Sequence, residues 1–265
     1  MKKTLLIFLL TLMVLLSFAG CGDDGASSNN GGTPDENGTS GFTFVDTVND
    51  YDRVDTETAE NFTVSSKKYD YENSNVVLLS VENHGDSNCT VTVGMTYCDE
   101  AGTELKTESQ IFDGFAAKWQ KYFLFDPGIT FSNYRYTVST EDYTGECYGK
   151  TFTIRYNGLK EDRVWADEET GFVKGILGDI RYKYEYSEIL DFSFDVVFFD
   201  NSGKIFKIFN GVKQKNVPPG EEHWYPGELV YGTEKSVEWP DNLKGETSGI
   251  IIFNSIVPNG EELSR

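Results

Sequence analysis

One strand-like segment occurs twice in this chain, 101 residues apart, and this repeat constrains the fold more than any other feature. The segment CTVTVGMTYCDEAGTEL at 89–105 aligns with LDFSFDVVFFDNSGKIF at 190–206. In both copies, apolar and polar residues alternate with the period of two that a half-buried β-strand requires. Because a slip of one residue would exchange the two faces, the same parity in both copies indicates a duplicated β-domain with the polar positions facing outward.

Further strand-like runs flank each copy of the repeat. The runs of the first unit are 75–83, 116–125, 133–140 and 148–156, the last of which is predicted to close that unit. The runs of the second unit are 178–186, 204–212, 221–230 and 248–256. Clusters of Gly, Pro, Asn and Asp separate the runs at the short spacing of an antiparallel sandwich. We therefore predict an all-β protein with two tandem antiparallel immunoglobulin-like β-sandwich domains, at 43–158 and 159–265.

The first twenty residues have the pattern of a targeting segment. Lys2 and Lys3 precede the apolar run 5–18, which is too short to span a bilayer as a helix and suits a signal-peptide core. The run closes with LSFAGC, which resembles the lipobox of bacterial lipoproteins, although Phe18 stands where that pattern usually has Leu. The resemblance implies removal of residues 1–20 as a signal peptide and attachment of a diacylglyceryl group to the Cys21 sulfur, often with an added N-acyl chain such as palmitate. An ordinary secretory signal with an incidental cysteine is the alternative.

A polar segment follows the predicted lipidation site. Residues 22–41 read GDDGASSNNGGTPDENGTSG and contain no large apolar side chain. Such a composition cannot bury a core, so we predict a lipidated cysteine and flexible linker over 21–42. Lipid anchor and linker together place the folded part on the extracytoplasmic face of the cell membrane.

The charge balance limits the class of partner. The chain has 43 acidic and 23 basic residues, a formal net charge of −20. Such a surface repels nucleic acid and anionic lipid headgroups. We therefore expect no nucleic-acid partner, and membrane contact only through the lipid on Cys21.

The repeated segment resembles the FxLYD-type immunoglobulin-like domains of bacterial surface lipoproteins. In the second copy the motif positions are Val196, Phe198, Phe199 and Asp200, and VPPGEE at 217–222 resembles the loop that follows. In the first copy they are Met95, Tyr97, Cys98 and Asp99, with FAAK at 115–118 in place of the loop. Neither copy begins with Phe, and an aromatic residue replaces the Leu of the motif. The resemblance implies binding or spacer modules without catalytic residues.

Each copy of the repeat ends in an acid followed three residues later by glycine. Asp99 with Gly102, and Asp200 with Gly203, match the first and fourth positions of a β-turn. Asp at the first position can accept hydrogen bonds from the following backbone amides, and Gly at the fourth can take a positive φ. A Ca²⁺ loop would need more oxygen ligands at alternating positions. We therefore predict turn-forming residues at these four positions, and not a metal site.

The sequence offers no motif for catalysis, for a metal or for a cofactor. The two histidines, His84 and His223, lie at non-equivalent places in the two units, and no nucleophile elbow accompanies them. The acidic stretch EDRVWADEETG at 161–171 is interpreted as a solvated connection between the domains, with a Ca²⁺-stabilised hinge as the alternative. We therefore predict a protein that is not an enzyme.

Three cysteines remain besides Cys21. They are Cys89, Cys98 and Cys147, an odd set that permits at most one disulfide. A Cys98–Cys147 or a Cys89–Cys147 bridge is conceivable, but small apolar filling of the core is the preferred interpretation.

Aromatic residues give the best sequence candidates for a binding face. These are Trp165 and the cluster EEHWYPGE at 221–228, which contains His223, Trp224 and Tyr225. Exposed aromatic side chains can anchor a protein partner or stack on a sugar ring, whereas buried ones belong to the core. The predicted function is a membrane-anchored, non-enzymatic binding or spacer module for an extracellular protein. A carbohydrate-binding or glycan-processing accessory lipoprotein, or an assembly partner of a transport machine, is the alternative.

Overall fold

The structure is a computed structural model that describes the backbone of residues 43–48, 55–59, 61–156, 160–166, 173–231 and 247–263. Side chains are described for 61–155, 180–223 and 247–263. The predicted signal peptide, Cys21 and the linker lie outside these ranges. Within the ranges, no helix is both long enough and apolar enough to cross a membrane.

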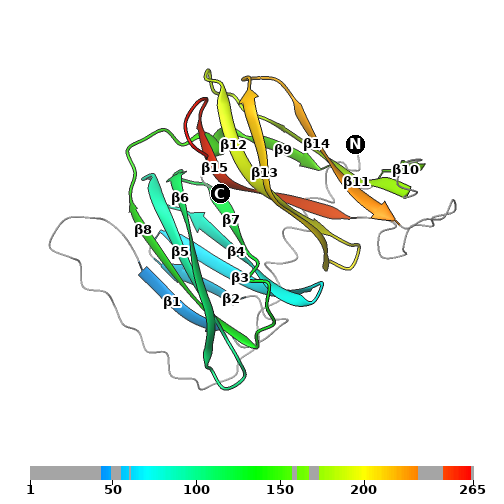
Figure 1. The fold of residues 1–265 in the computed structure, drawn as a ribbon. Coiled ribbons are helices and arrows are strands. Elements are labelled where there is room, and N and C mark those ends of the chain that lie inside the picture. The colour runs from blue at the N-terminus through cyan, green and yellow to red at the C-terminus, as the bar shows by residue number, and fades with distance from the viewer. Residues whose placement is uncertain are drawn as a thin grey trace, which may run out of the picture. The chain divides into compact units, whose positions relative to one another are not determined.

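The described residues form antiparallel β-strands and one short 3-10 helix, η1 (Tyr148–Thr151), with no α-helix among them (Figure 1). The strands of the first sandwich are β1 (Thr43–Val48), β2 (Asp55–Ala59), β3 (Phe62–Tyr71), β4 (Ser74–Asn83), β5 (Cys89–Cys98), β6 (Glu104–Phe115), β7 (Gln120–Phe125) and β8 (Asn133–Asp142). Those of the second are β9 (Thr153–Tyr156), β10 (Lys160–Ala166), β11 (Val173–Lys183), β12 (Leu190–Phe199), β13 (Ile205–Val217), β14 (His223–Tyr231) and β15 (Ser248–Pro258).

Each sandwich has two sheets. The strand orders in the first are β1-β8-β5-β6 and β2-β3-β4-β7. Those in the second are β13-β12-β15 and β10-β11-β14, with β9 also paired to β11. The predicted all-β fold with tandem antiparallel sandwiches is confirmed.

The repeated segment forms the central strand of one sheet in each sandwich. β5 is hydrogen-bonded to β6 and β8, and β12 is hydrogen-bonded to β13 and β15. Figure 1 shows each of these central strands continuing through a tight hairpin into the next strand of its sheet. The two strands therefore have equivalent neighbours.

The run 148–156 does not close the first unit as predicted. Its first half forms η1, and the backbone N–H of Phe152 donates to the carbonyl of Gly149 at 3.3 Å, which ends the helical turn. Its second half, β9, pairs with β11 of the second sandwich in antiparallel register. The Phe152 ring also packs against the rings of Phe192 and Phe253 in the second core. A period-two pattern identifies a strand but not its partner, and this is why the prediction was wrong.

The core of the first sandwich follows the predicted parity. In β5, Val91, Val93, Met95 and Tyr97 are buried, and the residues between them are partly exposed. These side chains pack against Phe115 of β6 and against the opposite sheet, within one buried apolar cluster. The alternation therefore marks a strand with one face in the core and one face toward solvent.

The outer face of β12 differs from the prediction. Ser193 and Asp195 were expected to point to solvent, but they are only 0% and 2% exposed. Val197 and Phe199, on the same face, belong to a second apolar cluster with residues of β3, β4 and β7. Tyr71 of β3 adds a hydrogen bond to this cluster, since its hydroxyl accepts from the Ile208 backbone N–H at 3.1 Å. β12 is therefore buried on both faces.

Candidate functional site

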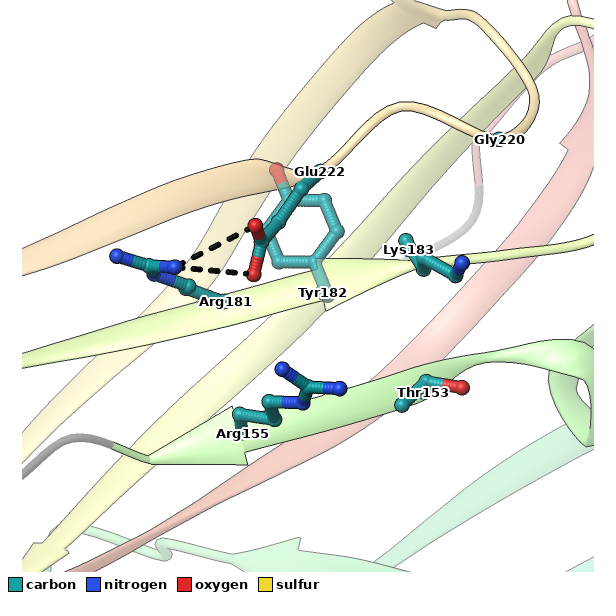
Figure 2. A pocket seen from close by; sticks show the side chains of 7 residues that line it. All are labelled: Thr153, Arg155, Arg181, Tyr182, Lys183, Gly220 and Glu222. Atoms are coloured by element: carbon teal, nitrogen blue, oxygen red, sulfur yellow. Dashed lines mark hydrogen bonds and ion pairs between the residues drawn. The ribbon is translucent and has the colours of Figure 1, made fainter.

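A cluster of basic side chains lies on one face of the β9–β11 pair. Antiparallel register places Arg155 opposite Arg181 and Thr153 opposite Lys183. Directly paired residues share a face, and so do residues two apart along one strand. Arg155, Arg181 and Lys183 therefore lie together, as Figure 2 shows, and we call these three residues the cationic site.

The loop before β14 supplies the acid that faces the cationic site. Gly220 has a φ of 74°, and its N–H donates to the Tyr184 carbonyl at 3.0 Å, which holds the loop against the end of β11. This positions Glu222, both of whose carboxylate oxygens lie 3.4 Å from Nη1 of Arg181 (Figure 2). Arg181 is thus already engaged by a carboxylate of the same chain.

The cationic site carries an excess of positive charge. Three cations face one carboxylate across a cavity of about 240 Å³ that they line with Thr153 and Gly220. Among the residues that the structure describes, Arg155 and Lys183 make no ion pair. Like charges placed opposite each other in a sheet are destabilising, so the Arg155–Arg181 pair has a cost in stability. The grouping of these cations also contrasts with the net charge of the chain, which is −20. Guanidinium and ammonium donors grouped in this way can hold an oxyanion.

Tyr182 lies under the cationic site, on the core side of β11. Its ring is buried against Phe192 and Phe194, with centroid distances of 5.3 and 6.0 Å. His223, which was predicted as a binding residue, pairs with Tyr182 and stacks on its ring at 5.6 Å and 18°. The structure therefore places His223 on the core side of the sheet, away from the cationic site.

The other predicted binding residues are placed only by their backbone. Trp224 and Tyr225 of β14 pair with Arg181 and Ile180, and Trp165 of β10 pairs with Lys174. Their side chains lie outside the described residues. Strand pairing thus places the Trp224 backbone beside Arg181, whereas Trp165 of β10 lies beside Lys174, seven residues earlier in β11.

The two predicted turns directly follow β5 and β12. In the first, Oδ1 of Asp99 accepts from the Thr103 N–H at 2.8 Å, and Gly102 has a φ of 81°. In the second, Oδ1 of Asp200 accepts from the N–H and hydroxyl of Ser202 at 2.8 and 2.7 Å. It also accepts from the Lys204 N–H at 3.0 Å, and the φ of Gly203 is 79°. Both carboxylates bond to their own turn, and this use of their oxygens suits a structural role.

The three described cysteines carry free thiols. Cys89 and Cys98 are buried at opposite ends of β5, and Cys147 is half-buried just before η1. Burial raises the pKa of the Cys89 thiol to about 12, and the neighbouring Cys147 contributes to this shift. A thiol with so high a pKa is a poor nucleophile at neutral pH.

Lys121 is a buried cation in the described residues. Its Nζ lies 4.4 Å from the ring centroids of both Phe112 and Phe123, and donates to the Tyr122 carbonyl at 3.0 Å. It also donates to the carbonyl of Phe253 in β15. Burial lowers the pKa of Lys121 to about 7, and the charge of Asp195 opposes this effect.

Neither the remaining histidine nor a group of acids forms a further site. His84 shares a hydrogen bond of 2.8 Å with the Thr63 hydroxyl and lies 3.7 Å from Glu82 on the surface. In the parts of the chain that are described, no three His, Cys, Asp or Glu side chains are grouped closely enough to hold a metal ion. The acidic stretch 161–171 has no described side chains.

No protein-family model matches the chain, and no curated protein matches it. Among solved structures, a protein from Parabacteroides distasonis that is inferred to be secreted matches with a TM-score of 0.21 and 8% sequence identity. The match covers 83% of this chain and 83% of that one. A likeness at this TM-score carries no argument, so the resemblances to a lipobox and to FxLYD-type domains stay predictions.

Sequence reasoning missed the cationic site. One part of its signal was readable, because GDIRYKYEY places Arg181 and Lys183 on one strand face and Tyr182 on the other. The other part was not, because Arg155 was assigned to the first unit. Only the pairing of β9 with β11 brings Arg155 beside Arg181.

Proposed function

We propose that this protein is a lipid-anchored, extracytoplasmic binding module without catalytic activity, and that its cationic site contacts a protein partner. The anchor is supported by LSFAGC with Cys21 and by the polar segment after it. The cationic site supports the binding function. Three basic side chains gathered on one sheet face of a strongly acidic protein are the single observation that carries the proposal.

The chemistry of the cationic site favours binding over catalysis. Its cavity is lined by two guanidinium groups, one ammonium and the hydroxyl-bearing Thr153 and Tyr182, with Glu222 as the acid. Arg and Lys side chains supply hydrogen-bond donors and no acceptor. Such donors recognise an anionic group through charge-assisted hydrogen bonds.

The anchor is tested with Cys21→Ser in the full chain. We expect the wild-type protein to be labelled by radioactive palmitate and to stay with the membrane fraction. The variant should lose the label and appear in the medium or periplasm. Retention of unlabelled variant on the membrane would contradict the anchor.

The binding function is tested by chemical cross-linking on intact cells that display the mature protein. A partner that depends on the cationic site should be captured by wild type and by Lys213→Gln, a variant at an exposed cation of β13. It should be lost from the double variant Arg155→Gln/Lys183→Gln. Capture of glycan-bearing material alone, unaffected by the double variant, would favour the carbohydrate alternative instead.

A further inference from the structure

The cationic site already holds one carboxylate, and this indicates the chemistry of its ligand. Nη1 of Arg181 is equidistant, at 3.4 Å, from the two oxygens of Glu222. Glu222 and Arg181 are both part-exposed at the rim of the cavity, with side chains 40% and 33% exposed. A pair in that position is screened by solvent and easily exchanged. An external carboxylate can therefore compete for Arg181 or add to the site beside it.

Arg155 and Lys183 are the cations that remain for a ligand. Arg155 is exposed on β9, and Lys183 is half-buried two residues beyond Arg181. Thr153, opposite Lys183, offers a hydroxyl donor on the same face. An incoming oxyanion would relieve the repulsion among these three neighbouring cations.

The volume and the charged lining of the cavity suit a single acidic side chain. A volume of about 240 Å³ lies below the range of roughly 300–1,000 Å³ that is usual for small-molecule sites. Among the described side chains of the lining, the aromatic one is Tyr182, whose ring is buried on the core side of β11. A single Asp or Glu side chain fits such a volume, and its carboxylate matches the guanidinium and ammonium donors of the cationic site.

We propose that the cationic site binds carboxylate side chains of an acidic segment in a protein partner, through Arg155 and Lys183 together with Arg181. This proposal rests on the proposed binding function and names the ligand class of that same site. Because the rest of the chain is strongly acidic, repulsion elsewhere would restrict such a segment to the cationic site.

The test is a titration of the mature protein with defined anions at low and high salt. The probes are a short capped poly-glutamate peptide, the matching poly-glutamine peptide, an oligogalacturonate of the same charge, and inorganic phosphate. We expect saturable binding of poly-glutamate only, weakened by salt as for any exposed ion pair. Arg155→Gln or Lys183→Gln should reduce the affinity about tenfold each, whereas Lys213→Gln should leave it unchanged.

Glu222→Gln is the sharpest variant, because it removes the internal competitor for Arg181. We expect the affinity for poly-glutamate to rise, by up to about fivefold. Loss of affinity in this variant would overturn the proposal, as would stronger binding of oligogalacturonate or phosphate than of poly-glutamate. If a cell-surface partner is captured equally by wild type and by Arg155→Gln/Lys183→Gln, the ligand assignment fails while the binding function stands.

A separate observation concerns the thiols of Cys89 and Cys147. Cys89 pairs with Phe115 of β6 on one side and with Asp142 of β8 on the other. The chain after β8 folds back over this end of the sheet, where the Tyr143 N–H donates to the Asn88 carbonyl at 3.1 Å.

The same turn of the chain brings Cys147 close to β6. A Cβ built on Gly114, the residue before Phe115, would lie 3.5 Å from the Cys147 Cα. The two cysteines therefore lie at the same end of the first sandwich. Cys98 lies nine residues further along β5, about 30 Å away at about 3.3 Å per residue, and cannot reach either of them.

We infer that Cys89 and Cys147 form a disulfide when the protein is outside the cytoplasm. The half-exposed Cys147 thiolate attacks a small disulfide such as oxidised glutathione and releases one glutathione thiol. The Cys89 thiol, which reacts slowly because of its raised pKa, then loses its proton and attacks the Cys147 sulfur, which forms the protein disulfide and releases the second glutathione thiol. The two protein thiols give up two protons and two electrons, and glutathione disulfide is reduced to two thiols. With Cys21 acylated, Cys98 is the cysteine that stays free.

This bridge is tested by incubating the mature protein with oxidised glutathione, blocking the remaining thiols, and mapping peptides by mass spectrometry. We expect a Cys89–Cys147 cross-linked peptide and an alkylated Cys98. Cys147→Ser, at the least buried of the three positions, should abolish the link with unchanged near-UV circular dichroism, and Cys98→Ser should retain it. Full alkylation of Cys89 and Cys147 after unfolding, or a link through Cys98, would overturn the assignment.

Discussion

The repeated strands β5 and β12 hold the same place in their sheets but have different surroundings. β5 alternates between buried and partly exposed residues, whereas every residue of β12 is buried. The difference lies in the outer face, which in β12 is covered by apolar side chains of β3, β4 and β7. The two strands thus share their pairing, while the second face is covered in β12 only.

Equivalent positions on the outer faces provide the largest test of this difference. Thr96 and Val197 align in the repeat, and Val197 is fully buried whereas Thr96 is partly exposed. Val197→Asp should reduce the free energy of unfolding by about 3 kcal/mol or more, because it buries an unpaired charge. Thr96→Asp should cost about 1 kcal/mol or less. Urea denaturation measures both. Equal losses would show that the outer face of β12 is not covered.

The buried Lys121 permits a test that uses pH. Its folded pKa is about 7, and an unfolded lysine has a pKa of about 10.4, so the unfolded chain binds more protons between these values. The free energy of unfolding should therefore rise with pH from about 7 to 9, by up to about 1.4 kcal/mol per unit from this group. Below about pH 7 Lys121 is protonated in both the folded and the unfolded state, so it contributes no further change in the free energy of unfolding with pH.

Lys121→Met should remove this rise. The measurement is the slope of the free energy of unfolding against pH, not its absolute value. The absolute value also changes because the variant leaves the carbonyls of Tyr122 and Phe253 without their donor. The series stops near pH 9, since buried tyrosines such as Tyr69, whose pKa is raised to about 12, act in the opposite sense at higher pH. A wild-type slope that persists in Lys121→Met would assign the pH dependence to other groups.

The two turns give a smaller, matched contrast. Oδ1 of Asp200 accepts three hydrogen bonds and the residue is 7% exposed, whereas Oδ1 of Asp99 accepts one and its turn is more open to solvent. We expect Asp200→Ala to cost about 2 kcal/mol and Asp99→Ala about 0.5 kcal/mol. Thermal or chemical unfolding resolves the two. A larger loss at Asp99 would mean that solvent replaces the bonds of Asp200 without cost.

Sequence reasoning recovered the repeated strands because alternation is a local signal, but it proposed no strand over β3 or β6. The limits of β5 and β12, and the turns after them, follow from side-chain period and from Asp and Gly at fixed offsets. It failed where the outcome depends on partners far away in sequence. Asp195 looks like a solvent-facing residue until its carboxylate is seen to accept from the Gly211 N–H at 2.7 Å under a covered face. Arg155 looks like the end of one domain until β9 pairs with β11.

The smallest contrast is a single hydroxyl in the two cores. Tyr97 of β5 aligns with Phe198 of β12, and the Tyr97 hydroxyl donates to Oε1 of Glu108 at 2.5 Å. Burial and this bond raise the pKa of Tyr97, so the hydroxyl stays protonated and remains a donor. Tyr97→Phe makes the first core like the second and should cost about 1 kcal/mol, the usual worth of a hydrogen bond to a charged acceptor that is part-exposed.

Glu108→Gln is the matched control, because its amide can accept the same bond without the charge. We expect it to cost less than Tyr97→Phe, and the double variant to cost no more than Tyr97→Phe alone. Additive losses would show that the two side chains act independently. In that case the aromatic ring would suffice at position 97, as it does at the equivalent Phe198, and the hydroxyl would have no part in the difference between the two sandwiches.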